Sequence, residues 1–111
     1  MAYNITMKFI ETPIFTKAIQ LLLEDDEYKS LQVALLLRPE QGSIIPGSGG
    51  LRKIRWASKG KGKRGGLRVI YYWDTKNEVF YMLLIYSKSK KDDLTPDQLL
   101  VLSQLVKEEL K

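Results

Sequence analysis

The sequence contains no cysteine and no histidine. Without cysteine, the chain can form no disulfide framework, no thiolate zinc site and no cysteine nucleophile. Without histidine, it has neither a Ser-His-Asp triad nor an imidazole acid or base. Any chemistry must therefore use lysine, arginine, tyrosine, carboxylate or hydroxyl groups.

Long apolar runs are missing as well. Residues 1–4 lead directly into a strand pattern, with no basic segment followed by an apolar one, and no stretch reaches the length that spans a bilayer. With 111 residues, of which 44% are apolar and 28% charged, the composition is typical of one soluble globular domain over residues 1–111. We expect a cytoplasmic protein with no membrane partner.

Acidic residues are absent between Glu40 and Asp74. The same interval holds eight basic residues: Arg52, Lys53, Arg55, Lys59, Lys61, Lys63, Arg64 and Arg68. Cations at this density repel one another and oppose folding, and the commonest anion that would offset them is a nucleic-acid backbone. A merely solubilising charge run is the alternative. We favour nucleic-acid binding because the cations lie on and between segments patterned as strands.

The N-terminal part predicts one strand and two helices. Residues 5–10 alternate as a short strand does, and Thr12-Pro13 is typical of a helix start, with a hydroxyl N-cap and proline at the first helical position. The acidic run 24–27 predicts the start of a second helix, which Pro39 ends. A metal site is the alternative for this run. We expect no metal and no cofactor, since no other ligand types lie nearby.

The C-terminal part predicts three strands and one helix. The glycine-rich residues 40–50 lack the Walker spacing and are interpreted as a loop that leads into the sheet. Strands are predicted over 51–57, 67–73 and 79–86, with a basic loop between the first two, and Thr95-Pro96 predicts a helix start with capping-box spacing.

These elements predict a compact α+β domain: strand, two helices, three antiparallel strands and a closing helix. One face of the sheet should pack on the helices. The strand period places Arg55, Arg68 and Lys88 on the other face, with the loop carrying Lys61, Lys63 and Arg64 above them. Pairing with acids of the N-terminal helices is the alternative for these cations, and it stays open above all for Lys53 and Lys59.

Three blocks of the sequence carry a family resemblance. Residues 49–56 (GGLRKIRW), 62–72 (GKRGGLRVIYY) and 84–95 (LIYSKSKKDDLT) are similar to the RelE superfamily of bacterial toxins, and nearest to its HigB-type branch. The resemblance covers nearly the whole chain. It implies a RelE-like toxin domain from a type II toxin–antitoxin pair, with a cognate antitoxin as its partner. It further implies a ribosome-dependent endonuclease that cuts mRNA in the A site of the 70S ribosome and so stops translation.

The resemblance also implies where the site lies. The family's strand arginine falls on Arg68, its basic positions on the preceding strand fall on Lys53 and Arg55, and its basic segment after the last strand falls on residues 88–91. Many relatives place a histidine or tyrosine just after that strand, where this chain has residues 93–95 (DLT). The identity of the general base therefore stays open.

RNA supplies its own nucleophile, the 2′-hydroxyl, so the enzyme has to align it, neutralise the phosphorane and move protons. We assign phosphate stabilisation to Arg64 and Arg68, because guanidinium grips phosphate oxygens in two places. Proton transfer is assigned to Lys88 or Lys91. Tyr72 or Tyr86 is a candidate for stacking on a base, and a place in the core is the alternative for both. RNA binding is assigned to Lys53, Arg55, Lys61, Lys63 and Lys90.

Two other function classes fit the basic strands: a toxin of the same fold that poisons DNA gyrase, and a plain RNA-binding module. The lysines of segment 88–91 favour the ribonuclease. The antitoxin has two possible binding modes. It can cover the basic site directly, or it can bind remotely by adding a strand at the sheet edge formed by residues 5–10. We lean toward the remote mode.

Overall fold

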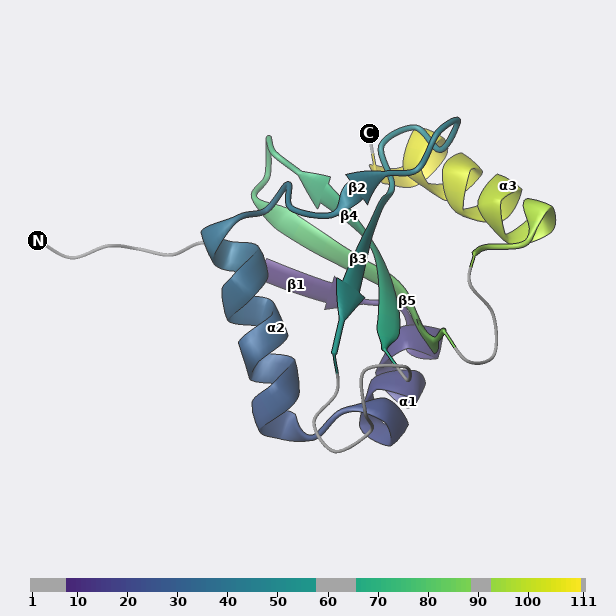
Figure 1. The fold of residues 1–111 in the computed structure, drawn as a ribbon. Helices are drawn as coiled ribbons and strands as arrows, with labels where there is room; N and C mark the ends of the chain where they lie inside the picture. The colour runs from purple at the N-terminus through teal and green to yellow at the C-terminus, as the bar shows by residue number, and fades with distance from the viewer. Residues whose placement is uncertain (1–7, 58–65, 89–92, 111) are drawn as a thin grey trace, which may run out of the picture.

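The computed structural model describes residues 8–57, 66–88 and 93–110. Its elements are, in order, β1 (Lys8–Glu11), α1 (Pro13–Leu22), α2 (Asp25–Leu37), β2 (Ser43–Ile44), β3 (Arg52–Trp56), β4 (Leu67–Asp74), β5 (Val79–Ser87), α3 (Pro96–Leu105) and the π-helical turn η2 (Val106–Leu110) (Figure 1). The predicted α+β class and element order are confirmed. The prediction lacked β2, which lies in the segment expected to be a loop.

Two helices begin where the sequence predicts. The Thr12 hydroxyl accepts a hydrogen bond from the backbone N–H of Phe15 at 3.1 Å, and Pro13 follows as the first residue of α1. At the start of α3, the Gln98 N–H donates to the Thr95 hydroxyl and the Thr95 N–H donates to the Gln98 side chain. Such caps satisfy N–H groups that have no partner within the helix.

The acidic run 24–27 forms the first turn of α2. The Glu24 N–H donates to the Glu27 carboxylate at 3.0 Å in a capping box, and the acids of this turn lie at the positive end of the helix dipole. Across the described ranges, no group of three or more acidic side chains is arranged to hold a metal ion. The run therefore has a structural explanation as a helix start.

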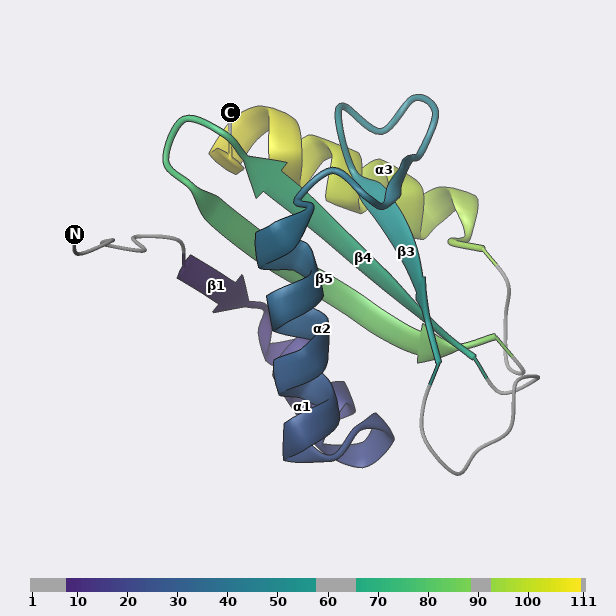
Figure 2. The same cartoon turned by 60° about the vertical axis from the view of Figure 1, so that its left-hand side comes forward.

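The strands form one sheet in the order β1-β5-β4-β3-β2. β1 pairs with β5 in parallel, and the other pairs are antiparallel. α1 and α2 lie on one face of the sheet, whereas α3 lies on the other (Figures 1 and 2). The expectation of one helix-covered face and one open face is therefore wrong in part, because α3 and η2 cover one end of the second face.

Each face has its own core. Under α1 and α2, Tyr71 and Phe80 are fully buried among aliphatic side chains. On the other face, Ile70, Leu83 and Val106 pack beneath α3 and η2. Within the described ranges, this second cluster includes no side chain of β3, so it does not extend to the end of the sheet where β3 ends and β4 begins.

Tyr71 fixes the segment that leads into the sheet. Its hydroxyl donates to the Pro39 carbonyl at 2.8 Å and accepts from the Gly42 N–H at 3.0 Å. Burial raises the pKa of Tyr71, which keeps the phenol protonated and able to donate. A side chain at residue 42 would meet the Tyr71 ring, since an added Cβ would lie 2.8 Å from Tyr71 Cε1. This close approach places β2 beside β3, with Ser43 opposite Lys53.

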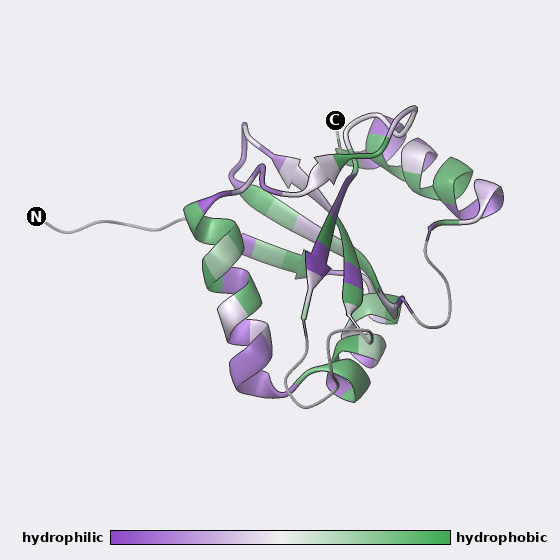
Figure 3. Cartoon of the chain, in the orientation of Figure 1, coloured by the Kyte–Doolittle hydropathy of each residue, from purple (hydrophilic) through white to green (hydrophobic). Residues whose placement is uncertain are grey.

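Hydrophilic residues concentrate on particular elements. Figure 3 shows them along β3 and in the first turns of α2, whereas much of β5 and α3 is hydrophobic. None of the helices within the described ranges combines the length and hydropathy needed to cross a bilayer.

Candidate nucleic-acid interface

Three basic side chains lie together at the end of the sheet where β3 ends and β4 begins, two of them in strands and the third directly after β5. Arg55 of β3 lies directly opposite Arg68 of β4, and Arg68 lies opposite Tyr86 of β5. Lys88 follows two residues after Tyr86, and its N–H donates to the Gly66 carbonyl at 3.0 Å, which extends the pairing. The structure thus brings Arg55, Arg68 and Lys88 together as the strand period predicts. Their catalytic and RNA-binding roles stay predictions.

These three cations line one open hollow, which we call the cation hollow. Its volume is about 300 Å³, and its lining residues are Arg55, Trp56, Ala57, Gly66, Arg68 and Lys88. A concave surface holds a phosphate closer to several cations at once than a flat surface does. The cation hollow therefore has the shape and the charge of an anion site.

Arg68 is the most deeply placed of the three. Only 4% of the residue is exposed, and one guanidinium nitrogen, Nη1, donates to the Leu67 carbonyl at 3.3 Å. Burial of the residue leaves its guanidinium largely dehydrated. A fixed, poorly hydrated cation stabilises developing negative charge more strongly than a solvated one.

Lys53 forms an ion pair that the sequence interpretation missed. Its Nζ lies 2.5 Å from Oδ1 of Asp93, a residue in the segment before α3. The hydrogen bond and the charge of Lys53 hold the pKa of Asp93 below its usual range, and Arg68 adds to the effect. Pairing of Lys53 with an acid of the N-terminal helices, the alternative left open above, is therefore wrong.

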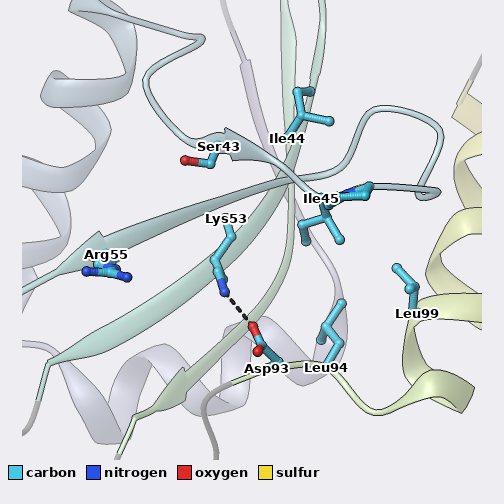
Figure 4. Close-up of a pocket in the computed structure, with 9 residues that line it drawn as sticks. Ser43, Ile44, Ile45, Lys53, Arg55, Asp93, Leu94 and Leu99 are labelled. Carbon is cyan, nitrogen blue, oxygen red and sulfur yellow. Dashed lines mark hydrogen bonds and ion pairs between the residues drawn. The ribbon is translucent and has the colours of Figure 1, made fainter.

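A second hollow adjoins the first, and we call it the apolar hollow. Its volume is about 540 Å³, and it is lined by Ser43, Ile44, Ile45, Pro46, Lys53, Arg55, Asp93, Leu94 and Leu99 (Figure 4). Arg55 lines both hollows. No local pattern indicates these walls, because they join β2 and the residues after it to the start of α3, some 50 residues further along the chain.

The remaining predicted site residues divide into two groups. Tyr72 and Tyr86 are half-buried and pack against the second core cluster, so the core alternative holds for both, and stacking by either stays a prediction. Five predicted basic residues lie outside the described ranges: Lys61, Lys63, Arg64, Lys90 and Lys91.

The sequence matches the family model of the RelE toxin of the RelE / RelB toxin-antitoxin system over residues 14–111. The chain therefore belongs to the RelE toxin family. This membership confirms the resemblance seen in the three sequence blocks. The HigB-type branch is a finer assignment that stays a prediction.

Solved structures agree on the fold. The intact E. coli RelBE toxin–antitoxin complex contains a chain with a TM-score of 0.54 and 17% identity, covering 71% of this chain and 93% of that one. A free E. coli RelE with two arginine-to-alanine substitutions matches with a TM-score of 0.56 and 16% identity, and the match covers 79% of this chain and 90% of that one. A chain of the archaeal RelE–RelB complex of Pyrococcus horikoshii matches with a TM-score of 0.51 and 23% identity, and the match covers 78% of this chain and 99% of that one. At these identities the likeness concerns the fold.

Proposed function

We propose that this RelE-family toxin is a ribosome-dependent mRNA endonuclease of the HigB-type branch, which cleaves translated message in the A site of the 70S ribosome. The observation that carries the proposal is the meeting of three cations around one hollow: Arg55 of β3, Arg68 of β4 and Lys88 directly after β5. A hollow with three cations suits a phosphodiester better than it suits any neutral ligand.

The proposed reaction uses the ribose of the message as the nucleophile. The 2′-hydroxyl loses its proton and attacks the adjacent phosphorus, the bond to the 5′-oxygen breaks, and that oxygen leaves with a proton. The products are a 2′,3′-cyclic phosphate and a free 5′-hydroxyl. The protein must therefore stabilise the charge of the phosphorane and move two protons.

Arg68 is the residue best placed to stabilise the phosphorane. Its side chain is already buried in the folded protein, so little water has to reorganise around it during the reaction. Arg55, which lines both hollows, would hold the backbone of the message, and Lys53 would add to RNA binding. In this proposal Arg64 assists Arg68, and Lys61, Lys63 and Lys90 bind RNA from outside the described ranges.

Lys88 or Lys91 moves the protons in this proposal. Lys88 lines the cation hollow on the side of β5, opposite Arg55 across Arg68, so a phosphate held by the arginines would lie within its reach. The ribosome completes the site by holding the message in an extended, unpaired form. A cognate antitoxin keeps the toxin inactive in the cytoplasm until translation is to be stopped.

Mapping of 5′ ends on a message translated in a purified system tests the proposal. We expect new ends within codons when toxin and ribosomes are both present, and none when ribosomes are omitted. A supercoiling assay with DNA gyrase, run in parallel, separates the function classes. Inhibition of gyrase with an intact message would favour a gyrase poison, and binding of message without cutting would favour an RNA-binding module.

A further inference from the structure

The apolar hollow differs in chemistry from the cation hollow beside it. Aliphatic side chains line two sides of it, Ile45 directly after β2, and Leu94 and Leu99 near the start of α3 (Figure 4). Its volume of about 540 Å³ lies within the range of roughly 300–1,000 Å³ found for small-molecule sites. Such walls suit a flat, weakly hydrated group better than a phosphate.

We propose that the apolar hollow binds one base of the message and that Lys53 and Asp93 read its Watson–Crick edge in favour of guanine. The inference rests on the proposed nuclease function, because the cation hollow is what brings the RNA backbone to this surface. Arg55 lines both hollows, so a phosphate held at Arg55 leaves a neighbouring base within reach of the apolar walls.

The position of Asp93 supports a role in base reading. Its carboxylate introduces a negative charge beside Lys53 and near Arg68, where it opposes phosphate binding. Its side chain is 72% exposed, and surface ion pairs contribute little to folding, so stability does not explain the pair. A carboxylate at this place gains a function if a ligand brings hydrogen-bond donors to it, as an RNA base does.

Guanine fits the pair better than the other bases. Its Watson–Crick edge presents two adjacent donors, N1–H and the N2 amino group, followed by the acceptor O6. A carboxylate has about four lone-pair sites, so Asp93 can accept from both donors while it keeps Lys53, whose ammonium has protons left for O6. Adenine and cytosine each offer the carboxylate one amino group, and uracil offers it one imino group.

The first test is a binding titration that needs no cleavage. Four 2′-O-methyl tetranucleotides, identical except for one base, are added to the full chain with labelled isoleucine and leucine methyl groups. The blocked 2′-oxygen prevents cutting. We expect the guanine oligonucleotide to shift the methyl signals of Ile45 and Leu99 and to bind roughly tenfold more tightly than the uracil one, as a good bidentate contact typically discriminates.

Asp93→Asn should remove this preference, because an amide presents one acceptor oxygen in place of two. Asp97→Asn is the matched control: it removes one carboxylate from an exposed position of α3 that does not line the apolar hollow, and it should keep the preference. Equal affinity for the four bases, a preference for a pyrimidine, or unchanged discrimination by Asp93→Asn would overturn the proposal.

The second test uses the translation system with a message library that varies one codon. We expect cuts to concentrate at codons with guanine at one fixed position, and Asp93→Asn to flatten that distribution. Cutting without a guanine preference would leave the nuclease standing and overturn the base pocket. Absence of cutting together with guanine-selective binding would reject the nuclease and leave the pocket intact.

Discussion

Arg55 and Arg68 lie directly opposite each other in the β3–β4 ladder, so the sheet holds two like charges at its closest cross-strand spacing. Like charges in that arrangement are destabilising. Arg68 is also 4% exposed and has lost most of its hydration. We therefore expect an anion bound beside the two arginines to lower the repulsion between them.

Arg68→Met tests this relationship. Methionine keeps an unbranched side chain in the apolar surroundings of β4 and removes the charge facing Arg55, so we expect the unfolding free energy to stay within about 1 kcal/mol of the parent or to rise. Activity should fall by about 10²–10³-fold, the usual loss when a fixed donor to the transition state is removed. Thermal melts and growth arrest at matched expression check both expectations.

Arg68→Lys is the control for charge alone. It keeps the cation and loses the planar fork, so we expect activity between that of the parent and that of Arg68→Met. A variant with methionine that stays toxic, or that melts far below the parent, would contradict the assignment of Arg68 to phosphate stabilisation.

Lys88→Ala should lower cleavage by about 10²–10⁴-fold, the range that a positioned acid or base supplies, while the melting temperature stays the same. Lys29→Ala is the control, since Lys29 is exposed on α2, which covers the opposite face of the sheet. Initial rates on translated message at saturating toxin check the pair. Equal losses in both variants would show that net charge, rather than the place of Lys88, decides the rate.

Binding to RNA should weaken steeply as salt is raised. For single strands the slope of log affinity against log salt is roughly −0.7 for each phosphate contact. Arg55→Gln should therefore make the slope shallower by about 0.7, whereas Lys29→Gln should leave it unchanged. Filter binding between low and physiological salt measures both slopes. A slope near zero for the parent would mean that the basic residues are not the contact surface.

The turn between β4 and β5 contains a carboxylate whose contribution to the free energy of unfolding should depend on pH. The Asp74 carboxylate accepts from the Asn77 amide at 2.9 Å and from the backbone N–H groups of Asn77 and Lys76, and these bonds, the Asn77 amide first, hold its pKa below the usual range. Asp74→Asn should be less stable by about 1 kcal/mol near neutral pH.

The sign of the Asp74 effect follows from the direction of the shift. A carboxyl group whose pKa is lowered by folding contributes fully above its unfolded pKa of about 3.9, and the contribution is lost as the pH falls through the folded pKa. Urea denaturation at several pH values should show the gap between parent and Asp74→Asn closing on acidification. A gap that is constant or widens at low pH would contradict this explanation.

Much of this arrangement follows from local sequence. Thr12 and Thr95 cap helices because the hydroxyl and the following proline act within one turn, whatever the rest of the chain does. The alternation of Arg55 and Arg68 with apolar residues fixed which face they occupy, because successive side chains in a strand point to opposite faces. It was therefore predictable from the sequence that Arg55 and Arg68 lie on the same face of the sheet.

Other features depend on partners far away in the sequence. Lys53 and Asp93 are 40 residues apart, and nothing around either residue indicates the other. The two residues of β2 form a strand because Tyr71 holds the preceding segment against the sheet. The shift in register between Ile70 and Tyr71 likewise belongs to the pairing of β4 with β5, so no local sequence pattern predicts it.

The antitoxin should bind away from the cation hollow. β1 is an edge strand of the sheet, and Ile10 is 46% exposed there, so a partner strand has a place to add. We expect Arg55→Glu to end toxicity and to leave antitoxin affinity within about threefold, and Ile10→Lys to weaken the complex at least tenfold. Calorimetry with the cognate antitoxin measures both, and the reverse pattern would establish direct masking of the site.

The central claim is that the toxin cleaves mRNA on the ribosome and that the residues around the cation hollow, Arg55, Arg68 and Lys88, catalyse this cleavage. The most direct measurement maps 5′ ends on a single translated message with the parent and with folded Arg68→Met, each with and without ribosomes. We predict cuts inside codons for the parent with ribosomes and in no other arm. Cuts by Arg68→Met equal to those of the parent, or parent cuts that need no ribosome, would contradict the account.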